Sequence, residues 1–405
     1  MNFTKITDSA SIGGNCNPQY SSRNPFNCDN TRMLILEPGH FGLYDVETLQ
    51  RIGPLTFLGD SNEPIWSRSN PNVFYSHREN SIYTSDLTIG LIRTFTEYTS
   101  ITFGGESDIS EDGDHIAVVG TKPDGTREAF LYRISTNDKS AITPILPNFD
   151  ACYVTPDLDL LISYGPGGLW IFNTTTESLR QLTNADGHHG IMRDADGSSI
   201  CIWTNSNENP VTLPNFPNGI VKIELATGKQ VGLLSLDWSL AVHISCTRKG
   251  PFCIVETYDP KNPNSAVRFG NAILQVPING NESTELFKHG SNSSTYDGQP
   301  RASIAGDASR FIFGSNQCGP LTDTFYAAFA APTPTPTPTP TPAPSPTPTN
   351  PTVPMFHYPD QQGLTAANFP AKPGEGGFVW DGKQMHVILH DGQHKFAGTM
   401  TNLGK

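Results

Sequence analysis

Short apolar runs alternate with polar turns along most of this chain, and the turns often contain Asp or Gly. A polar turn between two such runs is typical of a β-hairpin. The run–turn–run unit recurs seven times, at 26–35, 66–74, 109–118, 154–162, 192–200, 246–254 and 302–311. Consecutive units lie roughly 40 to 56 residues apart, which is the repeat length of a four-stranded propeller blade. The pattern therefore predicts an all-β protein, a seven-bladed β-propeller.

The two ends of the repeat region predict how the ring of blades closes. Most units are followed by a third and a fourth apolar run, as at 220–231, where the runs flank a Thr-Gly turn. The seventh unit has a third run at 324–329 and then enters prolines, while residues 2–6 form a spare run. Because an open ring leaves exposed strand edges, we expect residues 2–6 to complete the seventh blade.

A tract composed almost entirely of Thr and Pro separates the repeats from the C-terminal segment. Proline fixes φ and removes a backbone donor, so this tract predicts an extended linker. The chain then divides into a propeller at 1–331, a linker at 332–354 and a small β module or strand-donating tail at 355–405. Such linkers are common in secreted and surface proteins, and we expect an extracellular or cell-surface location.

Residues 355–405 are too few to bury much core by themselves. Strands are expected at 377–381 and 384–390, the second leading through an Asp-Gly turn to 394–398. Three roles remain open for this segment: packing on its own propeller, binding a glycan, or lending a strand to a neighbouring molecule.

Composition and charge narrow the classes of partner. The net charge of −13 disfavours nucleic acid, because nucleic-acid binding depends on Lys and Arg neutralising phosphates. No apolar run is long enough for a membrane span. The seven cysteines form no CxxC pair, and Cys246 and Cys253 flank an apparent turn, so either a disulfide or two buried thiols is expected there. The acidic segment at 108–114 is expected to be a solvated turn, because its spacing differs from that of an EF-hand.

Polar residues recur where each innermost strand is expected to begin, and these starts gather at one mouth of a propeller. Six of the seven residues at this position can form hydrogen bonds or titrate. The seven are Arg23, Glu63, Glu106, Ala151, His189, His243 and Gln299, and His188 and Arg301 lie beside them.

The segments GHHGIMRDADGSSICIW, AVHISCTRKGPFCIVETY and GQPRASIAGDASRFIFGSN resemble the bacterial TolB-like and oligogalacturonate-lyase-like propellers, over about residues 1–330. That resemblance implies His and Gln ligands for a divalent metal at the propeller mouth, and cleavage of polyuronates by β-elimination. Here His189, His243 and Gln299 are the candidate ligands, for manganese or calcium. The paired histidines of the family are replaced by Gln299-Pro300-Arg301.

Two other interpretations of the same ring stay open. Arg23 and Arg301 are candidates to bind a carboxylate, with Glu63 and Glu106 binding hydroxyls of a polar ligand, and His188 is a further ligand-binding candidate beside them. Alternatively, these groups pair with one another and fill the channel. We expect an extracellular propeller that recognises a polysaccharide or another surface partner, with catalysis left open. The alternative is a structural surface or filament-forming protein that self-associates through residues 355–405.

Overall fold

The computed structural model describes residues 2–85, 89–105, 107–143, 149–164, 167–184, 187–205, 218–248 and 250–329, and four short strands beyond them. The chain forms two compact units, Met1–Ala331 and Pro332–Lys405. No helix among these residues has the length and apolar character needed to cross a bilayer.

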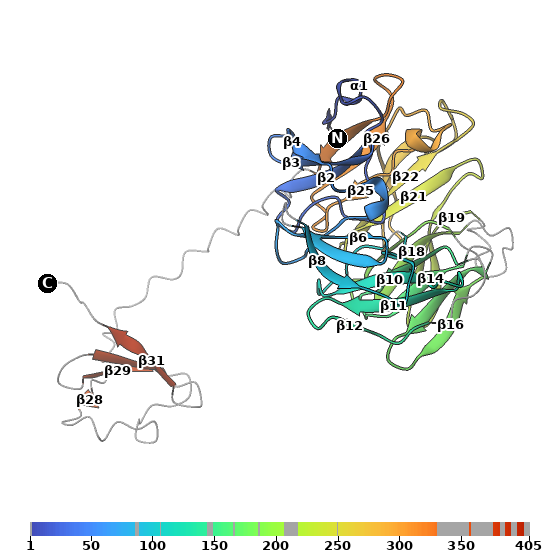
Figure 1. Cartoon of the computed structure of the whole chain (residues 1–405). Helices are drawn as coiled ribbons and strands as arrows, with labels where there is room; N and C mark the ends of the chain where they lie inside the picture. Colours follow the sequence, from blue (N-terminus) through green and yellow to red (C-terminus); the bar gives the residue numbers. More distant parts are fainter. Residues whose placement is uncertain are drawn as a thin grey trace, which may run out of the picture. The chain divides into compact units, whose positions relative to one another are not determined.

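The first unit is a seven-bladed β-propeller, as the repeats predict (Figure 1). Blade 1 contains β2 (Arg32–Glu37), β3 (His40–Asp45) and β4 (Arg51–Leu55). Blade 2 contains β5 (Ile65–Trp66), β6 (Phe74–Arg78), β7 (Ser81–Ser85) and β8 (Ile89–Thr94). Blade 3 contains β9 (Ser100–Thr102), β10 (His115–Thr121), β11 (Arg127–Arg133) and β12 (Asp138–Lys139). Blade 4 contains β13 (Ala151–Val154), β14 (Leu160–Ser163), β15 (Leu169–Asn173) and β16 (Ser178–Thr183). Blade 5 contains β17 (His189–Arg193), β18 (Ser199–Asn205), β19 (Gly219–Glu224) and β20 (Gln230–Ser235). Blade 6 contains β21 (Ala241–Cys246), β22 (Phe252–Tyr258), β23 (Ala272–Pro277) and β24 (Thr284–Lys288). Blade 7 contains β25 (Ser303–Ile304), β26 (Arg310–Ser315), β27 (Asp323–Ala328) and β1 (Phe3–Lys5). The short helices are α1 (Ser9–Ile12), η1 (Asp60–Asn62) and η3 (Tyr296–Gly298).

The apolar core is divided among the contacts between neighbouring blades. Each of seven buried clusters joins two adjacent blades, so the clusters follow one another around the ring. In β14, Ile162 packs toward blade 3 and its neighbour Leu161 packs toward blade 5, because successive side chains of a strand point to opposite faces. Strands that are buried on both faces explain why the inner runs are continuously apolar.

The first strand of the chain closes the ring by pairing with the last. β1 is antiparallel to β27, with Phe3 opposite Ala327 and Lys5 opposite Phe325. Asp323 then holds the segment after β1: its carboxylate accepts hydrogen bonds from the Ser9 backbone at 2.8 Å and from Thr7 Oγ1 at 3.1 Å. This is the closure that the spare run at residues 2–6 predicts.

In blades 1 and 3, the inner part of the repeat unit departs from the strand that the pattern predicts. In blade 1, a single bridge joins Phe26 to Met33, and β2, β3 and β4 form the sheet. In blade 3, the inner strand is β9, and the expected partner of β10 at residues 109–111 has no regular strand. Ser110 and the Asp-Gly-Asp sequence at 112–114 favour local hydrogen bonds over a continuous ladder.

The second unit contains one sheet. Its strands are β28 (Phe356–His357), β29 (Gly376–Trp380), β30 (Met385–Leu389) and β31 (Lys395–Met400), paired in chain order. β28 and β29 are parallel, and the other two pairings are antiparallel. The Thr-Pro linker lies outside the described residues.

Candidate functional site at the propeller mouth

A buried carboxylate holds one of the predicted histidines in place. His243 on β21 lies opposite Glu256 on β22, and the side chains meet at 2.5 Å between Nδ1 and Oε1. The other oxygen of Glu256 accepts a hydrogen bond from the backbone of Ala302, at the start of blade 7. Burial opposes the charged form of Glu256, but the adjacent His243 and these hydrogen bonds hold its pKa below the usual range. An ionised carboxylate on Nδ1 orients the ring and leaves Nε2 as the second nitrogen.

His188 and Tyr20 complete a cluster with this pair. The ring of His188 lies 4.5 Å from the ring of His243, measured between centroids, and His188 Nδ1 lies 2.9 Å from the Tyr20 hydroxyl. Burial, together with the neighbouring His243 and His189, lowers the pKa of His188 to about 3. His188 is therefore neutral at physiological pH. We call Tyr20, His188, His243 and Glu256 the mouth cluster.

His189 points away from the mouth cluster. Its ring packs 4.3 Å from that of Tyr153 in blade 4, and its Nδ1 lies 2.5 Å from the Gly187 carbonyl. Its Nε2 is buried without a hydrogen-bond partner and lines the channel cavity, which has a volume of about 60 Å³. Because one water needs roughly 10–15 Å³, this space holds a few waters and is too small for a sugar ring. A ligand as large as a sugar ring does not fit inside this cavity.

The structure brings His243 together with His188 rather than with His189. Gln299, the third predicted ligand, is half-buried and follows η3. Within the described ranges, no group of three or more His, Cys, Asp or Glu side chains is arranged to hold a metal ion. Two adjacent imidazoles with Nδ1 already hydrogen-bonded are an incomplete ligand set. The set His189, His243 and Gln299 stays a prediction.

Two other predicted ligand-binding residues interact with each other and with the protein. Arg23 contacts the Glu63 carboxylate at 3.4 Å and donates to the Gly105 carbonyl at 3.0 Å. Glu63 also accepts a hydrogen bond from the backbone of Phe103 at 2.7 Å and lies 3.0 Å from His77 Nε2. Burial opposes the charge on Glu63, but Arg23 and His77 keep its pKa low. These contacts agree with the interpretation in which the polar groups pair internally; Glu106 lies outside the described residues.

Arg301 is beneath an aromatic ring. Its guanidinium carbon lies 4.0 Å from the centroid of the Tyr296 ring, and its Nη2 donates to the Tyr296 carbonyl at 2.9 Å. Only 3% of Arg301 is exposed. In this arrangement the guanidinium supports Tyr296 and does not face solvent.

An ion-pair network lies at the opposite end of the innermost strands, and the seven predicted mouth positions do not include its residues. Asp108 lies 2.5 Å from Arg68 and 3.3 Å from Arg248, which come from blades 2 and 6. Burial and the adjacent Arg68 lower the pKa of Arg248 to about 10, which leaves it charged. Arg193 contacts Glu111 at 2.6 Å. The signal was present in the repeats, because each of the three arginines follows the inner run of its unit.

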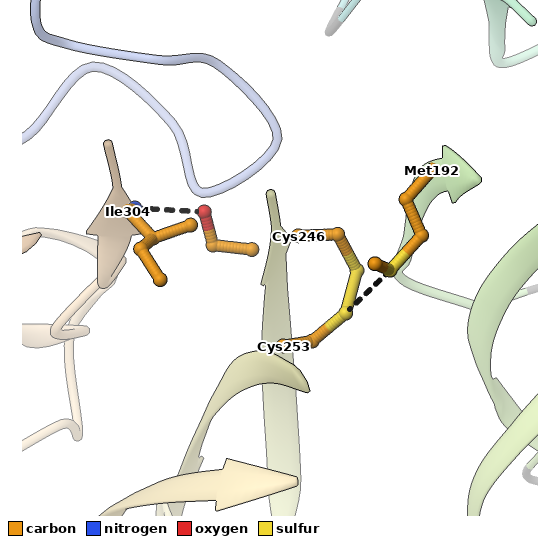
Figure 2. The surroundings of a disulfide bond; sticks show 5 residues. Met192, Cys246, Cys253 and Ile304 are labelled. Atoms are coloured by element: carbon orange, nitrogen blue, oxygen red, sulfur yellow. Dashed lines mark hydrogen bonds between the residues drawn. A yellow bond between two sulfur atoms is a disulfide. The ribbon is translucent and has the colours of Figure 1, made fainter. Parts of the chain in front are cut away.

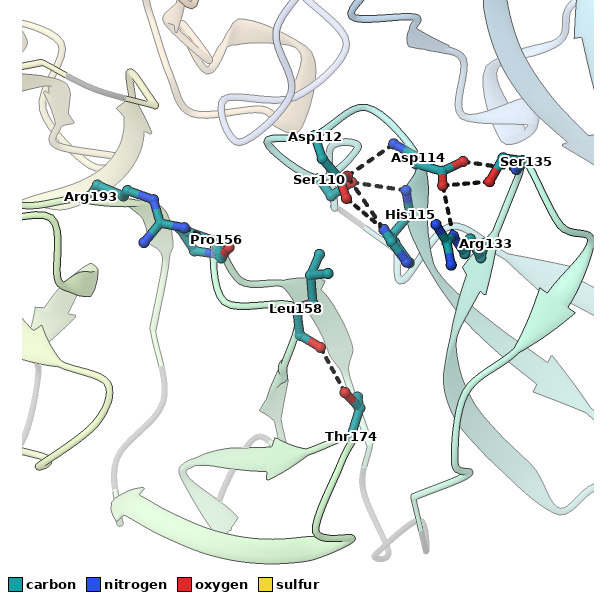
Figure 3. A network of polar contacts seen from close by, with 10 residues as sticks. All are labelled: Ser110, Asp112, Asp114, His115, Arg133, Ser135, Pro156, Leu158, Thr174 and Arg193. Atoms are coloured by element: carbon teal, nitrogen blue, oxygen red, sulfur yellow. Dashed lines mark hydrogen bonds and ion pairs between the residues drawn. The ribbon is translucent and has the colours of Figure 1, made fainter. Parts of the chain in front are cut away.

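The acidic segment at 108–114 forms a turn, as predicted, but it is only partly solvated, because Ile109 and Ser110 are buried and Asp108 pairs with arginines (Figure 3). Asp112 lies 3.0 Å from His115 Nδ1, and Asp114 accepts from Arg133 at 2.9 Å and from Ser135. Figure 3 also shows Arg193 reaching Pro156, whose carbonyl accepts at 2.8 Å.

The predicted alternatives for Cys246 and Cys253 are decided in favour of a disulfide (Figure 2). The two residues are directly opposite on β21 and β22, with 4.4 Å between their Cα atoms. Cys253 Sγ also lies 3.4 Å from Met192 Sδ in blade 5. The disulfide therefore sits in the contact between two blades, and its Cys246 lies on β21, the strand that carries His243.

No protein-family model and no curated protein matches the chain. Among solved structures, an oligogalacturonate lyase from Vibrio parahaemolyticus aligns with a TM-score of 0.59 at 12% identity, covering 81% of this chain and 93% of that one. An oligogalacturonate lyase in complex with manganese aligns with a TM-score of 0.58 at 13% identity and the same coverage. At these identities the similarity concerns the fold. The chain has a seven-bladed propeller fold, which aligns over most of its length with these two oligogalacturonate lyases.

Proposed function

We propose that this protein binds a uronate-containing polysaccharide across the mouth of its propeller and cleaves it by β-elimination. The observation that carries the proposal is the mouth cluster, in which a phenol and two imidazoles lie above a buried carboxylate. Such groups suit the hydroxyls and ring oxygens of a sugar. The shared fold of oligogalacturonate lyases supports a polysaccharide-related role.

In β-elimination a base removes the proton from the carbon next to the uronate carboxylate, and a C=C double bond forms to the neighbouring carbon. The glycosidic oxygen on that neighbouring carbon leaves and takes up a proton, from the protonated base or from water. We assign the base to His243, because the Glu256 carboxylate on Nδ1 fixes its orientation and balances the charge that develops on the ring. His188 has too low a pKa to accept a proton efficiently near neutral pH, so its role is to position Tyr20 and the sugar.

A divalent metal would neutralise the uronate carboxylate and acidify the adjacent proton. One neighbour in fold is named as a complex with manganese. The donors that converge here are two imidazoles, which fall short of a full ligand set. The proposed elimination therefore uses protein side chains, and its dependence on a metal is measured in the test.

An extracellular or surface location is part of the proposal. The Cys246–Cys253 disulfide supports it, because such bonds persist in oxidising compartments. The Thr-Pro tract, which is typical of linkers in exported proteins, supports it as well.

The test is ultraviolet absorbance during incubation with polygalacturonate, with added manganese or with a chelator. We expect absorbance to rise as unsaturated uronate ends form, and we expect His243→Gln to lower the rate by about 10²-fold or more. A rise that chelation abolishes would add a metal to the site. A flat trace with manganese present would refute the elimination reaction, and polysaccharide binding would then be tested separately.

A further inference from the structure

Two large aromatic side chains are exposed on the face that carries the mouth cluster. Trp238 is 54% exposed on the loop between β20 and β21, and Tyr296 is 61% exposed on η3, in the segment between β24 and β25. Both loops lead into innermost strands, of blades 6 and 7 respectively, and β21 carries His243. By contrast, the exposed Ile52 and Leu91 lie on the outermost strands β4 and β8.

Hydrogen bonds to the residues before and after Trp238 hold the loop that presents it. Asn218 Nδ2 donates to the Asp237 carbonyl at 2.9 Å, and the Ser239 backbone donates to the Asp237 carboxylate at 2.9 Å. The Leu240 backbone donates to the Asp237 carbonyl at 3.1 Å, which closes a tight turn. The exposed indole therefore belongs to an ordered turn, and little conformational entropy is lost when a ligand covers it.

Tyr296 is supported on one face and free on the other. The Arg301 guanidinium lies under the ring at 4.0 Å and also donates to the Tyr296 carbonyl. This side chain is almost fully buried, and its Nε has no hydrogen-bond partner, so packing and charge fix it beneath the ring. Arg301 is a positioning residue that presents the outer face of Tyr296 to solvent.

We propose that Trp238 and Tyr296 are stacking platforms for pyranose rings of a polysaccharide that crosses blades 6 and 7. A pyranose ring has an apolar face of C–H groups, and Trp and Tyr offer a flat apolar surface with a polar edge. The proposal rests on the proposed function for the nature of the ligand, which is a polysaccharide. It does not depend on the charge of the sugar, because stacking uses the ring faces.

The test is electrophoretic retardation in gels that contain polygalacturonate or a neutral β-glucan. Replacing Trp238 or Tyr296 with Ala is expected to weaken retention by about tenfold each, and Trp238→Phe and Tyr296→Phe are expected to retain most of the affinity. Leu91→Ala is the matched control, since Leu91 is 60% exposed on an outer strand. Equal melting temperatures establish that the variants are folded.

Arg301 has its own readout. Arg301→Gln is expected to weaken retention in the native background and to add nothing in the Tyr296→Ala background, because its effect passes through the ring. A purely structural role would lower retention by the same factor in both backgrounds.

The outcomes separate this inference from the proposed function. If the Trp238→Ala and Tyr296→Ala variants are retained as strongly as the native protein, the stacking platforms are refuted and the proposed function is not. Retention by neutral glucan alone, lost in the Ala variants, would refute the uronate specificity and support the platforms. A native protein that is retained by neither polysaccharide would refute both.

Discussion

Reduction of the Cys246–Cys253 disulfide is expected to destabilise the propeller by an amount that the structure sets. The bridge has a sequence separation of 7. Chain-entropy theory assigns a loop of this length about 2.4 kcal/mol at 25 °C. The stability gain is modest because the unfolded chain loses little freedom when so short a loop is closed.

The assay is urea unfolding followed by tryptophan fluorescence, since the indole of Trp203 is buried in blade 5. Reducing agent should lower the midpoint of the native protein and leave that of the Cys246→Ala/Cys253→Ala double variant unchanged. The matched control is Cys201→Ser, at a buried cysteine outside this disulfide, which should lose stability yet respond to reductant as the native protein does. Identical native midpoints with and without reductant, after thiol titration has verified reduction, would refute the reasoning.

Three further predictions address ring closure, pH and the C-terminal unit. Asp323→Asn should lower the free energy of unfolding by about 2 to 3 kcal/mol in thermal or urea unfolding, because the Asp323 carboxylate joins β27 to the N-terminal segment. The control is Asp307→Asn, since Asp307 lies in an exposed turn. Equal losses in the two variants would contradict the role of Asp323 in ring closure. The pKa of His188 is lower in the folded state than in the unfolded chain, so its contribution to stability is present above about pH 6.5 and is lost as pH falls toward about 3. The urea midpoint of His188→Gln should therefore fall less steeply with acid than that of the native protein, and parallel curves would contradict the shift. The strands of the C-terminal unit pair with one another, so deletion of residues 355–405 should leave the sedimentation state of the propeller unchanged; dissociation of an oligomer would instead support the surface-assembly alternative.

The blade architecture was predictable because its signal is local and repeated. A strand, a turn and a second strand leave the same pattern in every unit, and errors in one unit are corrected by the others. The site was harder, since a side chain's neighbours depend on which face of the strand it occupies. Counting from the turns selected His189, and the structure places its neighbour His188 against His243.

Glu256 was missed for a related reason. It lies on the second strand of its blade, and only the pairing register with β21 brings it opposite His243. The arginines of the ion-pair network around Asp108 recur in the repeats of the sequence, but their acidic partners come from other blades. Contacts between distant units depend on the curvature of the ring, which no local pattern specifies.

Closure of the ring by the first strand has a consequence for the order of events during synthesis. Thr7 and Asp323, which are hydrogen-bonded in the finished ring, are 316 residues apart in the chain. The first strand is made before any blade, and it must wait unpaired until the third strand of the last blade has left the ribosome. Meanwhile, blades 1 to 6 can form in sequence as an open arc, because each contacts mainly its neighbours. The nascent protein is therefore exposed to wrong pairing at both free edges from the synthesis of β1 until β27 is complete.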